Sequence, residues 1–212
     1  MIDRLYIEMT DGAKICSEDF GLILKSFDAP EPKPKTYRVS VDGADGDVDM
    51  TEWAGEVRYN TRIVTAAFRD MENEGYQRFV NAIHGRRCKI FISSDPDWYF
   101  TGRCEDAKSQ VRKRVANTPL SFTCQPYKQC RYPTIITAAI SESASIPLKA
   151  ARKSAIPQIK LTAQCTLTWK GTDYTKAAGT YTIPQIVLTD TADILTVAGS
   201  GTITITWTDG VI

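Results

Sequence analysis

The sequence predicts a mainly β protein in two parts. Residues 1–130 form a β-rich N-terminal domain with one α-helix and a β-hairpin, and residues 131–212 form an antiparallel β-sandwich. Most of the chain alternates apolar and polar residues in short segments, as half-buried strands do, and only residues 70–84 show helical spacing. Charged residues number 39 up to residue 130 and 12 beyond it, whereas threonine rises from 8 to 16. Because β-branched threonine suits a pleated surface, we expect the second part to be all-β.

Four strands are expected before the helix, at residues 6–9, 22–24, 35–41 and 56–68. Two loops lie among them. Residues 28–34 contain three prolines, and residues 41–49 are acidic and hold two glycines. The strand at 56–68 is expected to be a single long one, in which a bulge near Thr61 and Arg62 restores the alternation.

The predicted helix covers residues 70–84, where Tyr76, Phe79 and Ile83 recur at helical spacing. Asp70 is expected to cap its N-terminus and Gly85 to stop it. A hairpin follows, with strands at 88–92 and 98–104 around a short turn. Residues 105–124 are expected to supply a further pair of strands.

Six strands are expected in the second part, at residues 135–140, 158–161, 165–170, 180–188, 194–197 and 202–206. The last is the clearest, because Ile203, Ile205 and Trp207 alternate with threonines. Several short strands at regular spacing predict a sandwich.

Composition argues against several classes of function. The formal net charge is +1, from 26 Lys and Arg against 25 Asp and Glu, whereas a protein that neutralises phosphates carries a basic excess. His84 is the single histidine, which argues against multi-histidine metal or catalytic sites. No segment has the length of a membrane-spanning helix or the layout of a signal peptide. We therefore expect no nucleic-acid specificity, no membrane insertion and folding in a cytoplasm, where the six cysteines stay reduced.

One acidic stretch fits part of a calcium-loop template. Asp45, Asp47, Asp49 and Glu56 have the spacing of four ligands, but Met50 stands where the template needs glycine. The flanking segments also predict strands rather than helices. We interpret this stretch as a solvated acidic loop and expect no metal and no other cofactor.

Support for catalysis is weak. A hydrolase would use Asp95, Asp97 or Glu105 as a carboxylate pair, or His84 as a base. A proline-containing turn accounts for the two aspartates, and the end of a helix, where the dipole favours a cation, accounts for His84. We expect no catalytic residue and no enzyme activity.

Several segments, taken in order, resemble the distal tail proteins of siphophages. They are residues 41–49 with 59–62 and Phe68, the helix end 83–85 with 88–90, the hairpin strand 98–103, residues 122–128, and residues 201–210. Each motif alone is loose, but their succession covers nearly the whole chain.

The resemblance implies a structural protein of a phage or prophage tail tip. Six copies of such proteins form a ring through the N-terminal belt domain, and the C-terminal domain is a galectin-like β-sandwich. The ring joins the tail tube protein to the tail-associated hub or fibre protein and often anchors a receptor-binding protein. The chain would then be made and assembled in the cytoplasm of a bacterial host and lie at the tip of the virion tail.

Contacts of that ring are expected on the helix at 70–84, the hairpin at 88–104 and a basic seam. The candidate interface residues are Tyr76, Phe79, Arg86, Arg87, Trp98, Arg112 and Arg114. The alternative function is carbohydrate binding by the sandwich, in which Trp169, Tyr174 or Tyr181 would stack on sugar rings.

Overall fold

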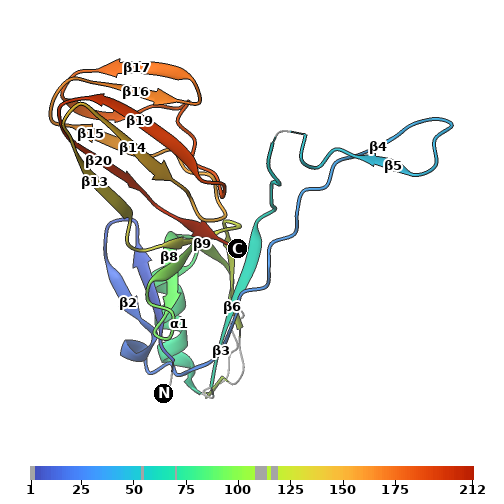
Figure 1. The fold of residues 1–212 in the computed structure, drawn as a ribbon. Coiled ribbons are helices and arrows are strands. Elements are labelled where there is room, and N and C mark those ends of the chain that lie inside the picture. The colour runs from blue at the N-terminus through green and yellow to red at the C-terminus, as the bar shows by residue number, and fades with distance from the viewer. Residues whose placement is uncertain (1–2, 54, 70, 108–113, 116–118) are drawn as a thin grey trace. The chain divides into compact units, whose positions relative to one another are not determined.

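The computed structural model describes residues 3–53, 55–69, 71–107, 114–115 and 119–212, and the chain divides into two compact units. The first unit comprises Met1–Lys128 with Ile212, and the second comprises Gln129–Val211. Strands dominate both units, as the sequence predicts. The described residues contain one α-helix, which belongs to the first unit (Figure 1).

The main sheet of the first unit is antiparallel throughout. Its strands in spatial order are β2 (Lys14–Cys16), β1 (Leu5–Met9), β8 (Arg87–Ile92), β9 (Trp98–Ala107), β11 (Pro119–Cys124), β6 (Arg62–Phe68) and β3 (Leu24–Asp28). The predicted hairpin is confirmed as the β8–β9 pair. The sheet edges are therefore β2 and β3.

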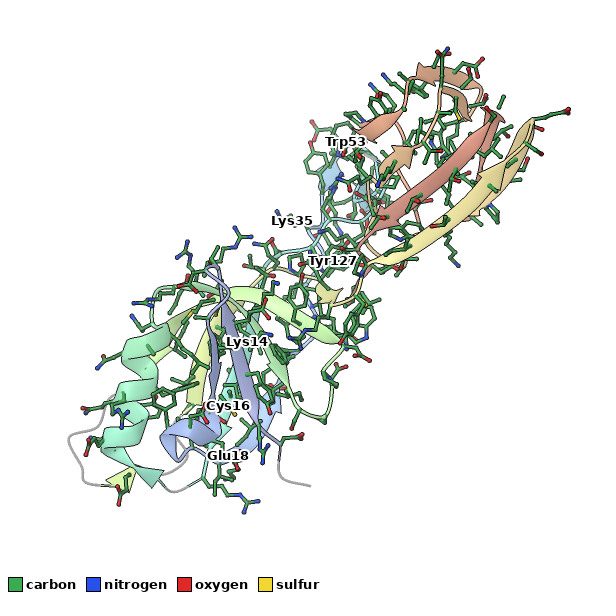
Figure 2. All side chains as sticks on the ribbon, turned by 90° about the vertical axis from the view of Figure 1, so that its left-hand side faces the viewer. Lys14, Cys16, Glu18, Lys35, Trp53 and Tyr127 are labelled. Atoms are coloured by element: carbon green, nitrogen blue, oxygen red, sulfur yellow. The ribbon has the colours of Figure 1, made fainter. Side chains whose placement is uncertain are left out.

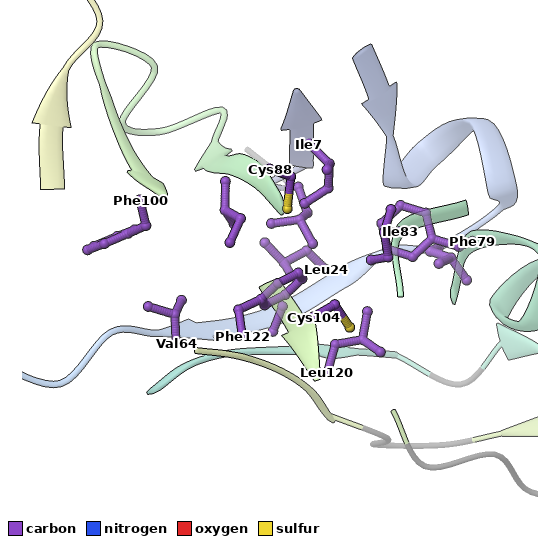
Figure 3. Close-up of a cluster of buried hydrophobic side chains, with 14 of the residues drawn as sticks. Ile7, Leu24, Val64, Phe79, Ile83, Cys88, Phe100, Cys104, Leu120 and Phe122 are labelled. Atoms are coloured by element: carbon purple, nitrogen blue, oxygen red, sulfur yellow. The ribbon is translucent and has the colours of Figure 1, made fainter. Parts of the chain in front are cut away.

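The inner face of this sheet carries the hydrophobic core of the first unit. Alternate residues of β6 are buried, whereas Ile63 on the opposite face is 57% exposed. Helix α1 (Asn73–Ile83) covers the inner face with Tyr76, Phe79 and Ile83. The Phe79 ring meets the Phe68 ring edge-on at 5.9 Å between centroids, which ties the helix to β6. Figure 3 shows this core.

The ends of α1 follow local backbone rules. Glu72 occupies the N-cap with an extended backbone, and Asp70, the predicted cap, lies outside the described residues. The helix stops where Gly85 takes a φ of +70°, which favours glycine. The short strand β7 (Met71–Glu72) directly precedes α1 and pairs with β10 (Arg114–Val115). The 3₁₀ turn η1 (Ser17–Phe20) packs beside α1.

Four expectations for the first unit need correction. The long strand expected at 56–68 begins only at β6, because residues 56–61 bond to the segment leaving β3 instead of to the sheet. The strand expected at 35–41 shortens to β4 (Arg38–Ser40). Its partner β5 (Asp47–Asp49) lies within the stretch expected to be an acidic loop. The strand expected at 22–24 lies later, as β3.

The second unit contains two four-stranded antiparallel sheets, which bears out a sandwich of short strands. One has the order β13 (Thr134–Ile140), β20 (Gly201–Trp207), β15 (Gln158–Leu161) and β18 (Gly179–Thr182). The other has the order β14 (Ser143–Leu148), β19 (Asp193–Gly199), β16 (Cys165–Trp169) and β17 (Thr172–Lys176). Strands β12 (Lys128–Cys130) and β21 (Gly210–Val211) also pair with each other.

Sequence patterns missed β14 and β17 and overextended β18. β14 contains Pro147, which is tolerated because β14 is an edge strand. β17 is a polar edge strand that lacks an apolar face. The strand expected at 180–188 ends at Thr182, two residues before Pro184, which has no N–H to donate.

Candidate functional site

Residues 29–61 connect β3 to β6 and leave the main sheet as a ribbon of one outgoing and one returning segment. We call this ribbon the arm. It carries the β4–β5 pair, which Figure 1 shows well away from β3 and β6. Backbone hydrogen bonds join its outgoing and returning segments, including Lys35 N to Arg58 O at 2.7 Å and Met50 N to Tyr37 O at 2.8 Å.

The arm has no hydrophobic core. Every described residue from 33 to 61 is exposed or half-buried, and none belongs to a core cluster. Its large apolar side chains face solvent: Trp53 is 73% exposed, Tyr37 55% and Val48 51%. Figure 2 labels Lys35 and Trp53 along this segment. Aromatic side chains exposed on such a ribbon are typical of a surface that contacts another protein.

The outer part of the arm is strongly acidic, and we call residues 41–53 the acidic tip. It holds five exposed carboxylates and no Lys or Arg: Asp42, Asp45, Asp47, Asp49 and Glu52. Thr51 donates hydrogen bonds to Asp49 from its hydroxyl and its backbone N–H, and these bonds lower the pKa of that carboxyl. The described residues contain no group of three or more His, Cys, Asp or Glu side chains placed to hold a metal ion.

Arg62 fixes the base of the arm. Its guanidinium donates to the backbone oxygen of Ala29, where the arm leaves, and to Pro126 O at 3.2 Å. It also lies 5.0 Å from the centre of the Phe100 ring. The side chain is 5% exposed, and this burial lowers the pKa of the guanidinium. Arg62 therefore holds the outgoing and returning ends of the arm together.

Three arginines gather where α1 ends and β8 begins, and we call Arg86, Arg87 and Arg103 the arginine patch. All three are exposed, and the strand register places Arg87 directly opposite Arg103. Arg103 Nη1 donates to Gly85 O at 2.6 Å, which holds this guanidinium at the backbone of the residue before Arg86. Among the described residues, no carboxylate forms an ion pair with any of the three.

The arginine patch is electrostatically unbalanced. Like charges directly opposite each other destabilise an antiparallel strand pair. The next cation on β8, Lys89, is balanced by Glu8 at 2.8 Å. Glu105, two residues from Arg103 on β9, accepts a hydrogen bond from Thr123 Oγ1 at 2.7 Å. An external anion on the patch would therefore relieve repulsion that the described part of the chain leaves uncompensated.

The other predicted interface residues lie in different surroundings. Tyr76 is 1% exposed and Phe79 0%, so both side chains serve the core of their own protomer. Trp98 is half-buried, with its ring centre 5.4 Å from Lys128 Nζ. Arg112 and the side chain of Arg114 lie outside the described residues. Arg86 and Arg87 are the candidates that the structure exposes.

The two aspartates considered for hydrolysis lie away from His84, and Glu105 follows Cys104, which forms a β-bridge with His84. Asp95 and Asp97 lie in the turn after β8, whereas His84 precedes that strand. A six-residue strand is about 20 Å long, so these groups lie at opposite ends of it. Asp95 instead pairs with Lys128 at 3.0 Å.

The cysteines and the aromatic residues of the sandwich also serve the fold. Burial raises the pKa of Cys88 to about 11 and that of Cys124 to about 12, which disfavours a reactive thiolate. All six cysteines are free of disulfides. Trp169 is 3% exposed, and Tyr174 and Tyr181 pack partly buried against the core of the second unit.

Sequence patterns missed the arm as one element. A signal was present: residues 28–62 contain no Leu, Ile or Phe, the residues that most often build cores.

Among the described residues, no helix is long and apolar enough to cross a membrane.

The whole fold is similar to a solved phage protein. The Dit protein of phage SPP1, a paradigm of the hub adsorption apparatus in phages infecting Gram-positive bacteria, aligns over 100% of both chains with a TM-score of 0.70 and 14% identity. A chain of the phage p2 baseplate in its activated conformation with Sr aligns over 98% of both chains, with a TM-score of 0.47 and 6% identity. Sequence comparison with family models and with curated proteins finds no match. The SPP1 likeness shows that the two chains share a fold.

Proposed function

We propose that this chain is a structural component of a phage or prophage tail tip. Six copies form a closed ring through the first unit, and the ring connects the tail tube protein to the hub or fibre proteins that carry receptor-binding proteins. The second unit, in this proposal, is the galectin-like domain outside the ring. The protein acts by assembly and not by catalysis, and it is assembled in the host cytoplasm.

The observation that carries the proposal is the arm without a core. Ordering one backbone residue costs about 1–2 kcal/mol, which buried apolar surface normally offsets. The arm buries none of its described residues from 33 to 61 and exposes Trp53, Tyr37 and Val48. A neighbouring chain that covered these side chains would supply the missing burial.

Two further observations support assembly into a ring. The fold matches the SPP1 hub protein over its full length, and a hub within a tail is an assembled part. The arm has no core whereas the body of the first unit has one, so a contact between the arm of one copy and the body of the next joins unlike surfaces. Such head-to-tail contacts close into rings when the rotation between copies is suitable.

Carbohydrate binding by the second unit is not favoured. Sugar-binding surfaces present exposed aromatic rings, and the three residues considered for that role are buried or packed against the core. No specific observation supports a glycan site.

Replacing the arm tests the proposal. Lys35 N bonds to Arg58 O, so an Asn-Gly turn in place of residues 36–57 fits between the two segments. We expect the wild type to form annular particles in negative-stain microscopy and the replaced variant to remain a folded monomer. A variant that still forms rings, or a wild type that never forms them at any concentration, would contradict the proposal.

A further inference from the structure

The acidic tip and the arginine patch carry opposite charges on one protomer, and the one ion pair described at either surface joins Asp49 of the tip to Arg38 at 4.0 Å. The tip carries five carboxylates, and the patch carries three guanidinium groups without an ion pair among the described residues. We propose that the acidic tip of one copy docks on the arginine patch of the next copy. This inference rests on the proposed ring and names the contact that closes it.

The arm is long enough to make this contact. Sixteen residue steps separate Ala29 from Asp45, and an extended chain spans at most about 3.3 Å per step, or roughly 53 Å. A folded body of about 100 residues has a radius of gyration of about 13 Å, so it is roughly 35 Å across. The tip can therefore pass beyond its own body and reach the body of a neighbour.

The chemistry of the two surfaces matches. Guanidinium groups bind carboxylates through charge-assisted, often bidentate hydrogen bonds. Asp49 is already bonded to Thr51 and paired with Arg38, whereas Asp45 and Asp47 at the turn into β5 are exposed, so we assign these two carboxylates to Arg87 and Arg103.

Apolar surface lies next to the charges on both sides. On β9, Tyr99 and Thr101 lie on the same face as Arg103, and both are half-buried. On the arm, Val48 and Trp53 are exposed beside the carboxylates. Docking would exclude water from the ion pairs, which strengthens them relative to solvated pairs.

Reversing the charges on each surface separately tests the contact. One variant carries Asp45→Lys and Asp47→Lys, and the other carries Arg87→Glu and Arg103→Glu. We expect each variant alone to stay monomeric, because residues 45 and 47 of its tip then carry the same sign of charge as residues 87 and 103 of its patch. Mixed in equal amounts, they should form rings of alternating copies, because residues 45 and 47 of each copy again face residues 87 and 103 of opposite charge on the next copy.

A matched control keeps the test specific. Lys149→Glu with Lys160→Glu makes the same change of charge as the patch variant, on exposed residues of the second unit, and should assemble like the wild type. Light scattering gives the mass of each sample, and urea unfolding shows that each variant is folded.

The outcomes separate the two proposals. If the wild type forms rings and either reversed variant alone also forms them, the docking contact is wrong and the ring stands. The contact is likewise overturned if folded variants fail to assemble when mixed. A wild type that stays monomeric overturns the ring itself, and this contact with it.

Discussion

Replacing Trp53 with alanine is expected to weaken assembly strongly and to leave the folded protomer unchanged. A tryptophan side chain buries about 150–250 Å² when covered. Trp53 is 73% exposed, so roughly 110–180 Å² remains for a neighbour to cover. At about 25 cal/mol per Å², complete coverage contributes up to about 3–4.5 kcal/mol per contact. The dissociation constant of each contact should then rise by about two to three orders of magnitude.

Sedimentation velocity over a wide concentration range measures this shift. Urea unfolding of the variant should differ from the wild type by less than about 0.5 kcal/mol, because an exposed side chain adds little to protomer stability. Tyr132→Ala is the matched control, since Tyr132 is 64% exposed on the second unit and should affect neither measurement. The reasoning is refuted if Trp53→Ala assembles like the wild type, or if it destabilises the protomer by several kcal/mol.

Three further predictions concern the fold. Gly102→Ala should lower the free energy of unfolding of the first unit in urea by about 1–3 kcal/mol, because its Cβ would lie 2.6 Å from Cys124 Sγ; an unchanged free energy would contradict the packing described. Stability should fall as pH rises above about 9, because Cys88 and Cys124 stay protonated when folded and ionise when unfolded. Cys124→Ala should flatten that slope in pH-dependent urea titrations, and an unchanged slope would exclude this cause. Asp209→Ala should destabilise the second unit by about 2–4 kcal/mol, because that carboxylate accepts three hydrogen bonds. Asp190→Ala, which removes a surface ion pair, should lower the free energy of unfolding by less than about 1 kcal/mol, measured by tryptophan fluorescence. Equal losses of stability in the Asp190 and Asp209 variants would contradict the structural role given to Asp209.

Elements with strict periodicity were predictable from the sequence. Ile203, Ile205 and Trp207 are all buried on one face of β20, as their alternation indicates. The helical spacing of Tyr76, Phe79 and Ile83 likewise identified α1. In both cases one face of the element packs against a core, so the spacing of apolar residues predicts the type of element and its buried face.

Elements without a core face were not predictable in the same way. In the arm, Tyr37 and Val39 alternate as a strand should, yet no sheet lies beneath them, because the segment pairs only with its own return. The alternation of residues therefore predicted a strand longer than β4 and an extension of β6 backward through residues 56–61. The strand β14 was missed for a related reason, since an edge position tolerates Pro147.

The candidate site was predictable in part. Arg86 and Arg87 stand out as charges in the sequence, but Arg103 joins them only through the register of β8 and β9. Tyr76 and Phe79 lie on the helix expected to contact a neighbour in the ring, whereas the structure buries both side chains in the core. Sequence spacing alone does not distinguish a helix face that covers its own sheet from one that meets a neighbour.

The mass of the purified wild-type protein tests the central claim most directly. Light scattering coupled to size exclusion should give about 142 kDa, six copies of a 23.6 kDa chain, with a lower mass at high salt because salt screens the attraction between the separated acidic tip and arginine patch. A mass that stays at 23.6 kDa across the accessible concentrations and at low salt would contradict the ring.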